Sequence, residues 1–225
     1  MRIDGARGRF LREESGFTLP ELMTTMVVML LVLFALYNLF DTGLRIFSFG
    51  NNKMEATENA RVGLEKMERE IRAAYPVNVS DPTKLYLFFN ANGSTTNPPQ
   101  AMPTATQITF GNDLDGSGTV ACGTPCEYIT YKLTANDSTN TACTASPCTL
   151  KRVNAANSTG VGDPVVENVV YNGLSLTYYK ADGTAATSEG QISRVRVSLE
   201  ITVDPGTTNE GTQELTSEIY LRNRQ

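Results

Sequence analysis

The feature that most constrains this chain is an apolar run near its start. Residues 17–40 form a stretch of 24 residues whose only charged side chain is Glu21. At about 1.5 Å per residue, a helix of this length reaches roughly 36 Å, which exceeds a hydrocarbon core of about 30 Å. The run therefore predicts a membrane-spanning helix, and the function of the chain has to be compatible with one.

The order of the parts around this run is unusual for an export signal. A polar leader with four arginines ends at Gly16, directly before the apolar run. An ordinary secretory signal has its apolar region before the cleavage site, and the site follows small residues. Here the candidate site, between Gly16 and Phe17, precedes the apolar region. Cleavage there removes only residues 1–16 and leaves the membrane helix on the mature chain.

The residues Gly16, Phe17, Thr18, Leu19 and Glu21, followed by a long apolar run, resemble the prepilin signal of type IV pilins and type II secretion pseudopilins. The resemblance implies cleavage after Gly16 by a prepilin peptidase and N-methylation of the new Phe17 amine. It also implies that the mature subunits associate through their N-terminal helices at an inner-membrane assembly platform.

Glu21 is the one acid in the apolar run. An unpaired carboxylate in lipid costs on the order of 2.5–3.5 kcal/mol. One interpretation is an acid at the level of the lipid headgroups, since Glu21 is only the fifth residue of the mature chain. The other is a carboxylate that acquires a positive partner during assembly. In pilins the implied partner is the Phe17 amine of a neighbouring subunit.

Pro20 stands where the family more usually has an aliphatic residue. A proline in the interior of a helix costs about 3 kcal/mol. In a mature helix that begins at Phe17, however, Pro20 lies in the first turn, where its missing N–H has no intrahelical acceptor. Pro20 therefore fits the cleaved chain.

The charges of the chain indicate its orientation and exclude some functions. The net charge is −5, and the sequence contains no histidine and no tryptophan. This argues against a general nucleic-acid-binding surface and removes His-based acid–base catalysis and His metal ligands. The leader arginines lie on one side of the span, and the other side opens with Asp41. The positive-inside tendency keeps the N-terminus cytoplasmic and exports everything after Phe40.

Helical periodicity resumes after the span and continues to Tyr75-Pro76, where proline ends it. Asp41–Gly43 and Gly50–Asn52 are candidate bends. An apolar stripe at helical spacing is formed by Phe49, Ala56, Ala60, Leu64, Met67 and Ile71. We interpret residues 41–75 as an amphipathic continuation of the helix, whose stripe packs on its own domain.

Past Pro76 the pattern changes to strands and turns. Alternating or apolar segments predict strands at residues 84–89, 107–110, 127–133, 149–153, 192–203 and 214–222. Within residues 165–179, two apolar runs flank Asn172-Gly173, which is a strong hairpin dipeptide. The sequence therefore predicts an α+β, pilin-like fold: one long N-terminal helix, with its outer half packed on the antiparallel sheet of an exported domain, residues 76–225.

Short motifs in this domain also resemble the minor pilins and J-type pseudopilins. They are Thr109-Phe110 before Asp113–Gly116, Tyr128–Leu133, Leu150–Arg152, Pro164–Val169 and Leu221–Asn223. The resemblance implies a structural subunit present in few copies, which primes or caps a cell-surface pilus or a periplasmic pseudopilus.

The four cysteines all lie on the exported side: Cys122, Cys126, Cys143 and Cys148. An even count in an oxidising compartment favours disulfides, and the Cys-x3-Cys and Cys-x4-Cys spacings differ from the usual zinc pattern. Local pairing, Cys122–Cys126 and Cys143–Cys148, is preferred because each bond closes a small loop at little entropic cost. Crossed pairing stays open, because spacing does not establish connectivity.

Residues 113–118, Asp-Leu-Asp-Gly-Ser-Gly, look like the opening of a calcium loop. An EF-hand needs a Glu at the twelfth position, and that position is Thr124. We interpret the segment as a turn built from Asp and Gly. Asp113 and Asp115 remain weak candidates for a calcium site that takes further ligands from elsewhere, and we expect no metal and no cofactor.

The sequence contains no recognisable catalytic set, so we expect no enzyme activity. Two other classes of function fit a single span. One is a static anchor that displays an adhesin-like binding domain, and it needs neither cleavage after Gly16 nor Glu21. The other is a membrane-tethered enzyme, which requires a deep pocket with convergent polar side chains in the β-rich domain.

Overall fold

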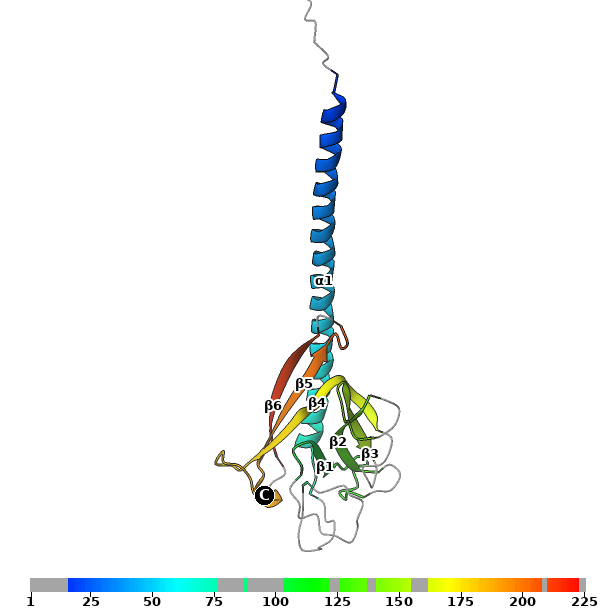
Figure 1. Cartoon of the computed structure of the whole chain (residues 1–225). Helices are drawn as coiled ribbons and strands as arrows, with labels where there is room; N and C mark the ends of the chain where they lie inside the picture. Colours follow the sequence, from blue (N-terminus) through cyan, green and yellow to red (C-terminus); the bar gives the residue numbers. More distant parts are fainter. Residues whose placement is uncertain are drawn as a thin grey trace, which may run out of the picture. The chain divides into compact units, whose positions relative to one another are not determined.

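The computed structural model describes residues 16–76, 87–88, 103–121, 126–136, 141–154, 162–207 and 210–222. These residues form one long helix, a six-stranded sheet and a short 3-10 helix (Figure 1). The elements are α1 (Leu19–Arg72), β1 (Gln107–Gly111), β2 (Tyr128–Ala135), β3 (Cys148–Asn154), β4 (Asp163–Tyr179), η1 (Glu189–Gln191), β5 (Arg194–Val203) and β6 (Gly211–Tyr220). The predicted α+β class, with a long N-terminal helix and an antiparallel sheet, is confirmed.

Two compact units divide within α1. The first ends at Ser48 and the second begins at Phe49. At both predicted bends, Asp41–Gly43 and Gly50–Asn52, the chain continues as α-helix. The helical residues after Ser48 therefore belong to the same unit as the sheet.

All strand pairs in the sheet are antiparallel, and the strands lie side by side in sequence order from β1 to β6. β5 shows most clearly how the sequence makes this sheet. Val195, Val197, Leu199 and Ile201 are buried on one face, while the residues between them are half-exposed on the other. This period of two is the alternation predicted for residues 192–203.

The core lies between the inner face of the sheet and the second part of α1. In the predicted apolar stripe, Phe49 and Ala56 are half-buried. The remaining stripe residues are buried in one cluster with side chains from every strand, and they are Ala60, Leu64, Met67 and Ile71. The prediction that the outer part of the helix packs on the sheet is confirmed.

Gly63 allows α1 to come close to β4. A Cβ atom built on Gly63 would lie 2.2 Å from Val166 Cγ2 and 3.1 Å from the carbonyl oxygen of Val165. Side-chain carbons do not approach one another so closely, so this contact requires the glycine. The apolar periodicity did not single out Gly63, because a glycine adds nothing to a hydrophobic stripe.

A largely buried ion pair also joins the helix to the sheet. Arg152 Nε of β3 donates to both carboxylate oxygens of Glu70, at 3.0 and 2.8 Å, and the Tyr131 hydroxyl of β2 donates to Glu70 Oε2 at 2.8 Å. The side chains of Arg152 and Glu70 are only 12% and 15% exposed. Burial, reinforced by the Glu70 carboxylate, raises the pKa of Tyr131 well above its usual value. The phenol therefore stays protonated and keeps donating.

The predicted hairpin at Asn172-Gly173 is wrong, because β4 runs through this dipeptide as one strand of 17 residues. From the pair Val169–Ile201 to the pair Leu174–Leu199, β4 advances five residues while β5 advances two. The additional residues form a bulge. Asn172 has a left-handed φ of 59°, which asparagine tolerates. The conformation that favours a hairpin turn is used here within a strand.

Five of the other predicted strands are confirmed. Those at residues 107–110, 127–133, 149–153, 192–203 and 214–222 overlap β1, β2, β3, β5 and β6. The strand predicted at residues 84–89 lies mostly outside the described residues. Phe88, one of its two described residues, is buried and forms an isolated antiparallel bridge with Phe110 of β1.

One predicted disulfide is present. Cys143 and Cys148 are bonded, with their Cα atoms 5.7 Å apart. The predicted local pairing of these two cysteines is confirmed, and the crossed alternative is wrong. Cys126 is also disulfide-bonded. The predicted partner of Cys126 is Cys122, which lies outside the described residues.

We expect Gly63→Ala to lower the free energy of unfolding by about 1–3 kcal/mol, because the new methyl group overpacks the contact between α1 and β4. Gly50→Ala is the matched control, since nothing lies within 4 Å of its Cβ position. In a helix this control should gain roughly 0.5–1 kcal/mol. Urea unfolding of the detergent-solubilised chain, followed by circular dichroism, measures both changes. Equal stability of Gly63→Ala and the wild type would contradict the close approach.

Candidate functional site

The start of α1 holds the residues predicted for processing and assembly. α1 begins at Leu19, two residues after Phe17. The carbonyl oxygen of Thr18 accepts a hydrogen bond from the N–H of Glu21 at 3.1 Å. Pro20 is therefore the second residue of the helix, where no N–H is needed. Its predicted place in the first turn is confirmed, although the helix begins two residues later than expected.

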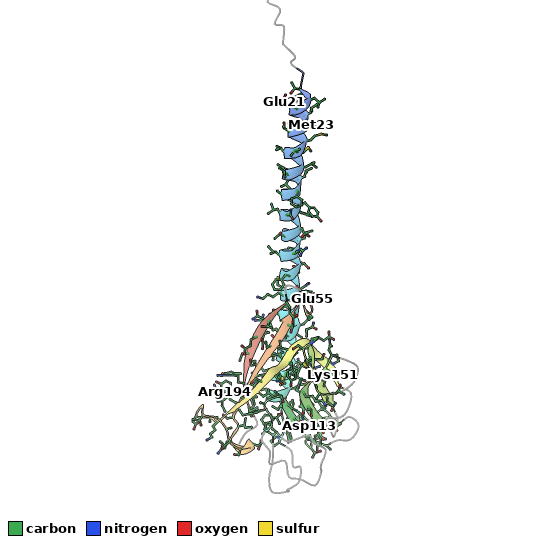
Figure 2. The ribbon with its side chains drawn as sticks, viewed as in Figure 1. Glu21, Met23, Glu55, Asp113, Lys151 and Arg194 are labelled. Atoms are coloured by element: carbon green, nitrogen blue, oxygen red, sulfur yellow. A yellow bond between two sulfur atoms is a disulfide. The ribbon has the colours of Figure 1, made fainter. Side chains whose placement is uncertain are left out.

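Glu21 lies in the first turn of α1 and is exposed (Figure 2). Among the described residues, none forms a hydrogen bond or a salt bridge with its carboxylate. The partial positive charge of the helix N-terminus favours an acid at this position. A full positive charge for Glu21 has to come from outside the described part of this chain.

Apolar side chains cover α1 on all sides between Glu21 and Asp41. All 19 residues from Leu22 to Phe40 are exposed and none is charged. A helical segment of this length reaches roughly 28 Å, close to the hydrocarbon core of about 30 Å. By length and composition α1 can span a membrane, and one carboxylate lies at each end of the apolar segment.

Exposed apolar residues continue beyond Asp41. The Asp41 carboxylate accepts a hydrogen bond from Arg45 Nε at 3.0 Å, one helical turn further along. Around this pair the large side chains of Leu44, Ile46 and Phe47 are exposed. A helix that is apolar all round is stable only against other apolar surface, either lipid or further helices.

Three carboxylates converge in the loop between β1 and β2. Oxygen atoms of Asp113, Asp115 and Glu127 all lie within 4.8 Å of one another. Sequence reasoning singled out the two aspartates but assigned Glu127 only to the beginning of a strand. Gly111, the last residue of β1, pairs with Tyr128, the first residue of β2. This pairing places Glu127, which directly precedes Tyr128, beside the residues that follow Gly111. Antiparallel pairing of the two predicted strands was the signal that could have revealed it.

Backbone N–H groups hold these acids in place. Asp113 accepts three such hydrogen bonds and Asp115 one, at 2.8–3.0 Å. Glu127 is only 3% exposed and accepts three more, at 2.9–3.3 Å. The donors are the backbone N–H groups of Leu114, Asp115, Gly116, Ser117, Gly118 and Ala121.

This geometry supports the interpretation of the loop as a turn built from Asp and Gly. Gly116 and Gly118 have φ values of 74° and 78°, which glycine adopts without steric cost. The hydroxyl and N–H of Ser117 lower the pKa of Asp115. Carboxylate oxygens are also the ligands that calcium takes. Of the described residues, these three acids are the group that could hold a cation, and Glu127 adds a ligand that the EF-hand spacing lacked.

The chain matches no protein-family model, no curated protein and no solved structure. Its function therefore has to be inferred from its own residues.

We expect Asp115 to titrate below its ordinary pKa of 3.8, and Ser117→Ala to raise this pKa because it removes the hydroxyl. Since the pKa is lowered in the folded state, the interaction stabilises the fold above pH 3.8, and this contribution is lost as the pH falls through the folded pKa. Carboxyl NMR titration of the chain in micelles measures the shift. Ser175→Ala in β4 is the control and should change nothing. A wild-type pKa at or above 3.8 would refute the expectation.

Proposed function

We propose that this chain is a structural subunit of a type IV pilus or a type II secretion pseudopilus. The observation that carries the proposal is the combination of Gly16-Phe17 with a single acid, Glu21, at the start of an exposed apolar helix. A static anchor needs the apolar helix but has no use for the acid or for a cleavage site ahead of the span.

Processing would create the positive charge that Glu21 lacks. Cleavage by a prepilin peptidase after Gly16 gives a Phe17 amine, which is protonated near neutral pH. The N-terminal end of each mature chain then carries a positive amine on Phe17 and a negative carboxylate on Glu21, four residues apart. If neighbouring helices pack with an axial offset, Glu21 of one subunit meets the Phe17 amine of the next. Charge-assisted pairs of this kind contribute roughly 1.5–3 kcal/mol.

The exported domain fits this role. The Cys143–Cys148 disulfide suits an oxidising compartment outside the cytoplasm. The domain would fold while the apolar helix stays in the inner membrane, and assembly would exchange lipid contacts for contacts with other helices. This exchange implies an assembly platform and a motor as partners. A low-copy role in priming or capping is what the resemblance to minor pilins and J-type pseudopilins implies.

The first test is the N-terminal mass of the chain recovered from membranes, with and without a prepilin peptidase. We expect a mature chain that begins at Phe17 and carries one additional methyl group, and an unprocessed chain when the peptidase is absent. An intact N-terminus in both samples would contradict the proposal and favour the static anchor with an adhesin-like domain.

A second test separates assembly from processing. Glu21→Ala should be cleaved normally but should enter filaments at least about tenfold less, because an interaction of more than 1.4 kcal/mol is lost. The measure is the ratio of sheared filament protein to membrane protein. Thr25→Ala, an exposed change one turn further along the helix, is the control. Unchanged incorporation of Glu21→Ala would count against the pairing.

A further inference from the structure

We propose that the free edge of β6 binds an extended segment of another filament subunit, and that this segment carries Lys or Arg at alternating positions. The identification of the partner as a filament subunit rests on the proposed function. The edge itself and its charge are features of the described residues.

β6 is a long and regular edge strand. It is the last strand of the sheet, coloured orange to red in Figure 1, and among the described residues it pairs only with β5. The pairing runs from Arg194–Tyr220 to Val203–Gly211 through ten residue pairs without a register shift. In an antiparallel ladder, alternate residues direct their N–H and C=O groups away from the paired strand. About half of the residues of β6 therefore present unpaired backbone groups to the side.

The opposite edge of the sheet is different. β1 has only five residues, and two isolated bridges cover part of it, Tyr75 with Gly111 and Phe88 with Phe110. Between described residues, no backbone N–H of β6 donates away from β5. The one backbone oxygen of β6 that accepts on that side is the Glu214 carbonyl, bound by the side-chain amide of its neighbour Gln213 at 3.3 Å. Within the part of the chain that the structure describes, the sheet is thus partly covered at the β1 edge and open at the β6 edge.

Proline, lysine and bulges, three of the devices that block an edge, are missing from β6. Its ten residues, Gly211–Tyr220, include no proline and no lysine, and the pairing with β5 has no bulge. The charged residues of the strand are two acids, Glu214 and Glu218, both on the outer face of the sheet. A long regular edge is a template for a further strand, and acids on it restrict that strand to one of complementary charge.

The charges on the outer face of β6 determine which side chains an added strand should carry. Glu218 is neutralised by Arg194 and Arg196 of β5, at 3.0 and 2.6 Å. Glu214 is not, because it pairs directly with Glu200 of β5 and its described partner is the Ser198 hydroxyl. Like charges directly opposite in a ladder are destabilising. A Lys or Arg on an added strand, beside Glu214, would neutralise Glu214 and so relieve its repulsion with Glu200.

β6 of a second copy of this chain lacks the residue that Glu214 requires. Its ten residues, Gly211–Tyr220, include no Lys and no Arg, so β6 as the added strand would place no basic residue beside Glu214. On the inner face Ile219 is buried and Leu215 is half-buried against the core, so apolar residues fit beside them, although Ser217 between them donates a hydrogen bond to Glu68 of α1 at 3.1 Å. The fitting segment therefore alternates basic and apolar residues.

Hydrogen exchange of the full-length chain in phosphatidylcholine nanodiscs tests this inference. The probe is a synthetic ten-residue peptide that alternates Lys and Val, and the control peptide alternates Glu and Val. We expect the first peptide to slow amide exchange in residues 211–220 at least about tenfold, because unpaired N–H groups become bonded, and the second to have no effect. Glu214→Lys should remove the response, whereas Glu167→Lys in β4, the matched charge change, should keep it.

A photo-crosslinker placed at Thr216 of β6 then identifies the partner in cells, with Thr177 of β4 as the position away from the edge. We expect adducts from Thr216 only, mapped by mass spectrometry to a filament-subunit segment with alternating basic residues. Equal protection by both peptides, or adducts to β6 of a second copy, would overturn the proposal. The peptide experiment does not depend on N-terminal processing, so its failure and failure of the proposed function are distinguishable.

Discussion

The fold depends on how the second part of α1 is fixed to the sheet. Gly63 brings the helix against β4, and Glu70, two helical turns later on the same side, binds Arg152 and Tyr131. Loss of one member of a buried ion pair typically costs about 3–5 kcal/mol, because the other charge remains buried without a partner. Steric fit therefore sets the distance between helix and sheet, and the ion pair sets the position of the helix along the sheet.

The same helix has two kinds of surface that obey different physics. Residues 60–71 bury one apolar stripe against the sheet and expose Arg61, Glu65 and Arg69 on the opposite side, as in other amphipathic helices. The residues between Glu21 and Asp41 have no such division and are apolar on every side. The second unit is stabilised by its own core, whereas the apolar segment needs lipid or other helices. Folding of the domain and burial of the segment are therefore separate events.

Hydrophobic periodicity correctly predicted those elements whose buried face repeats along the local sequence. The helical stripe and the alternation in β5 were correct because burial of one face repeats at a fixed interval. The hairpin at Asn172-Gly173 was wrong, because a left-handed asparagine serves a bulge as well as a turn. The contacts of Glu70 with Arg152, and of Glu127 with the aspartate loop, join residues that no spacing relates. Packing of α1 on the sheet creates the first contact, and pairing of β1 with β2 creates the second. The resemblance to a prepilin signal lies at the other extreme, since it is carried entirely by residues 16–21 and the apolar run that follows them.

The order of the strands has a consequence for the growth of the sheet. Each strand pairs with the one immediately before it in the sequence, so no strand has to wait for a later segment before it can pair. A chain that emerges N-terminus first can therefore add strands one at a time, through contacts of short sequence separation, which form faster than distant ones. β6 is the final addition. Among the described strands, the sheet thus ends in an open ladder on the strand that pairs last.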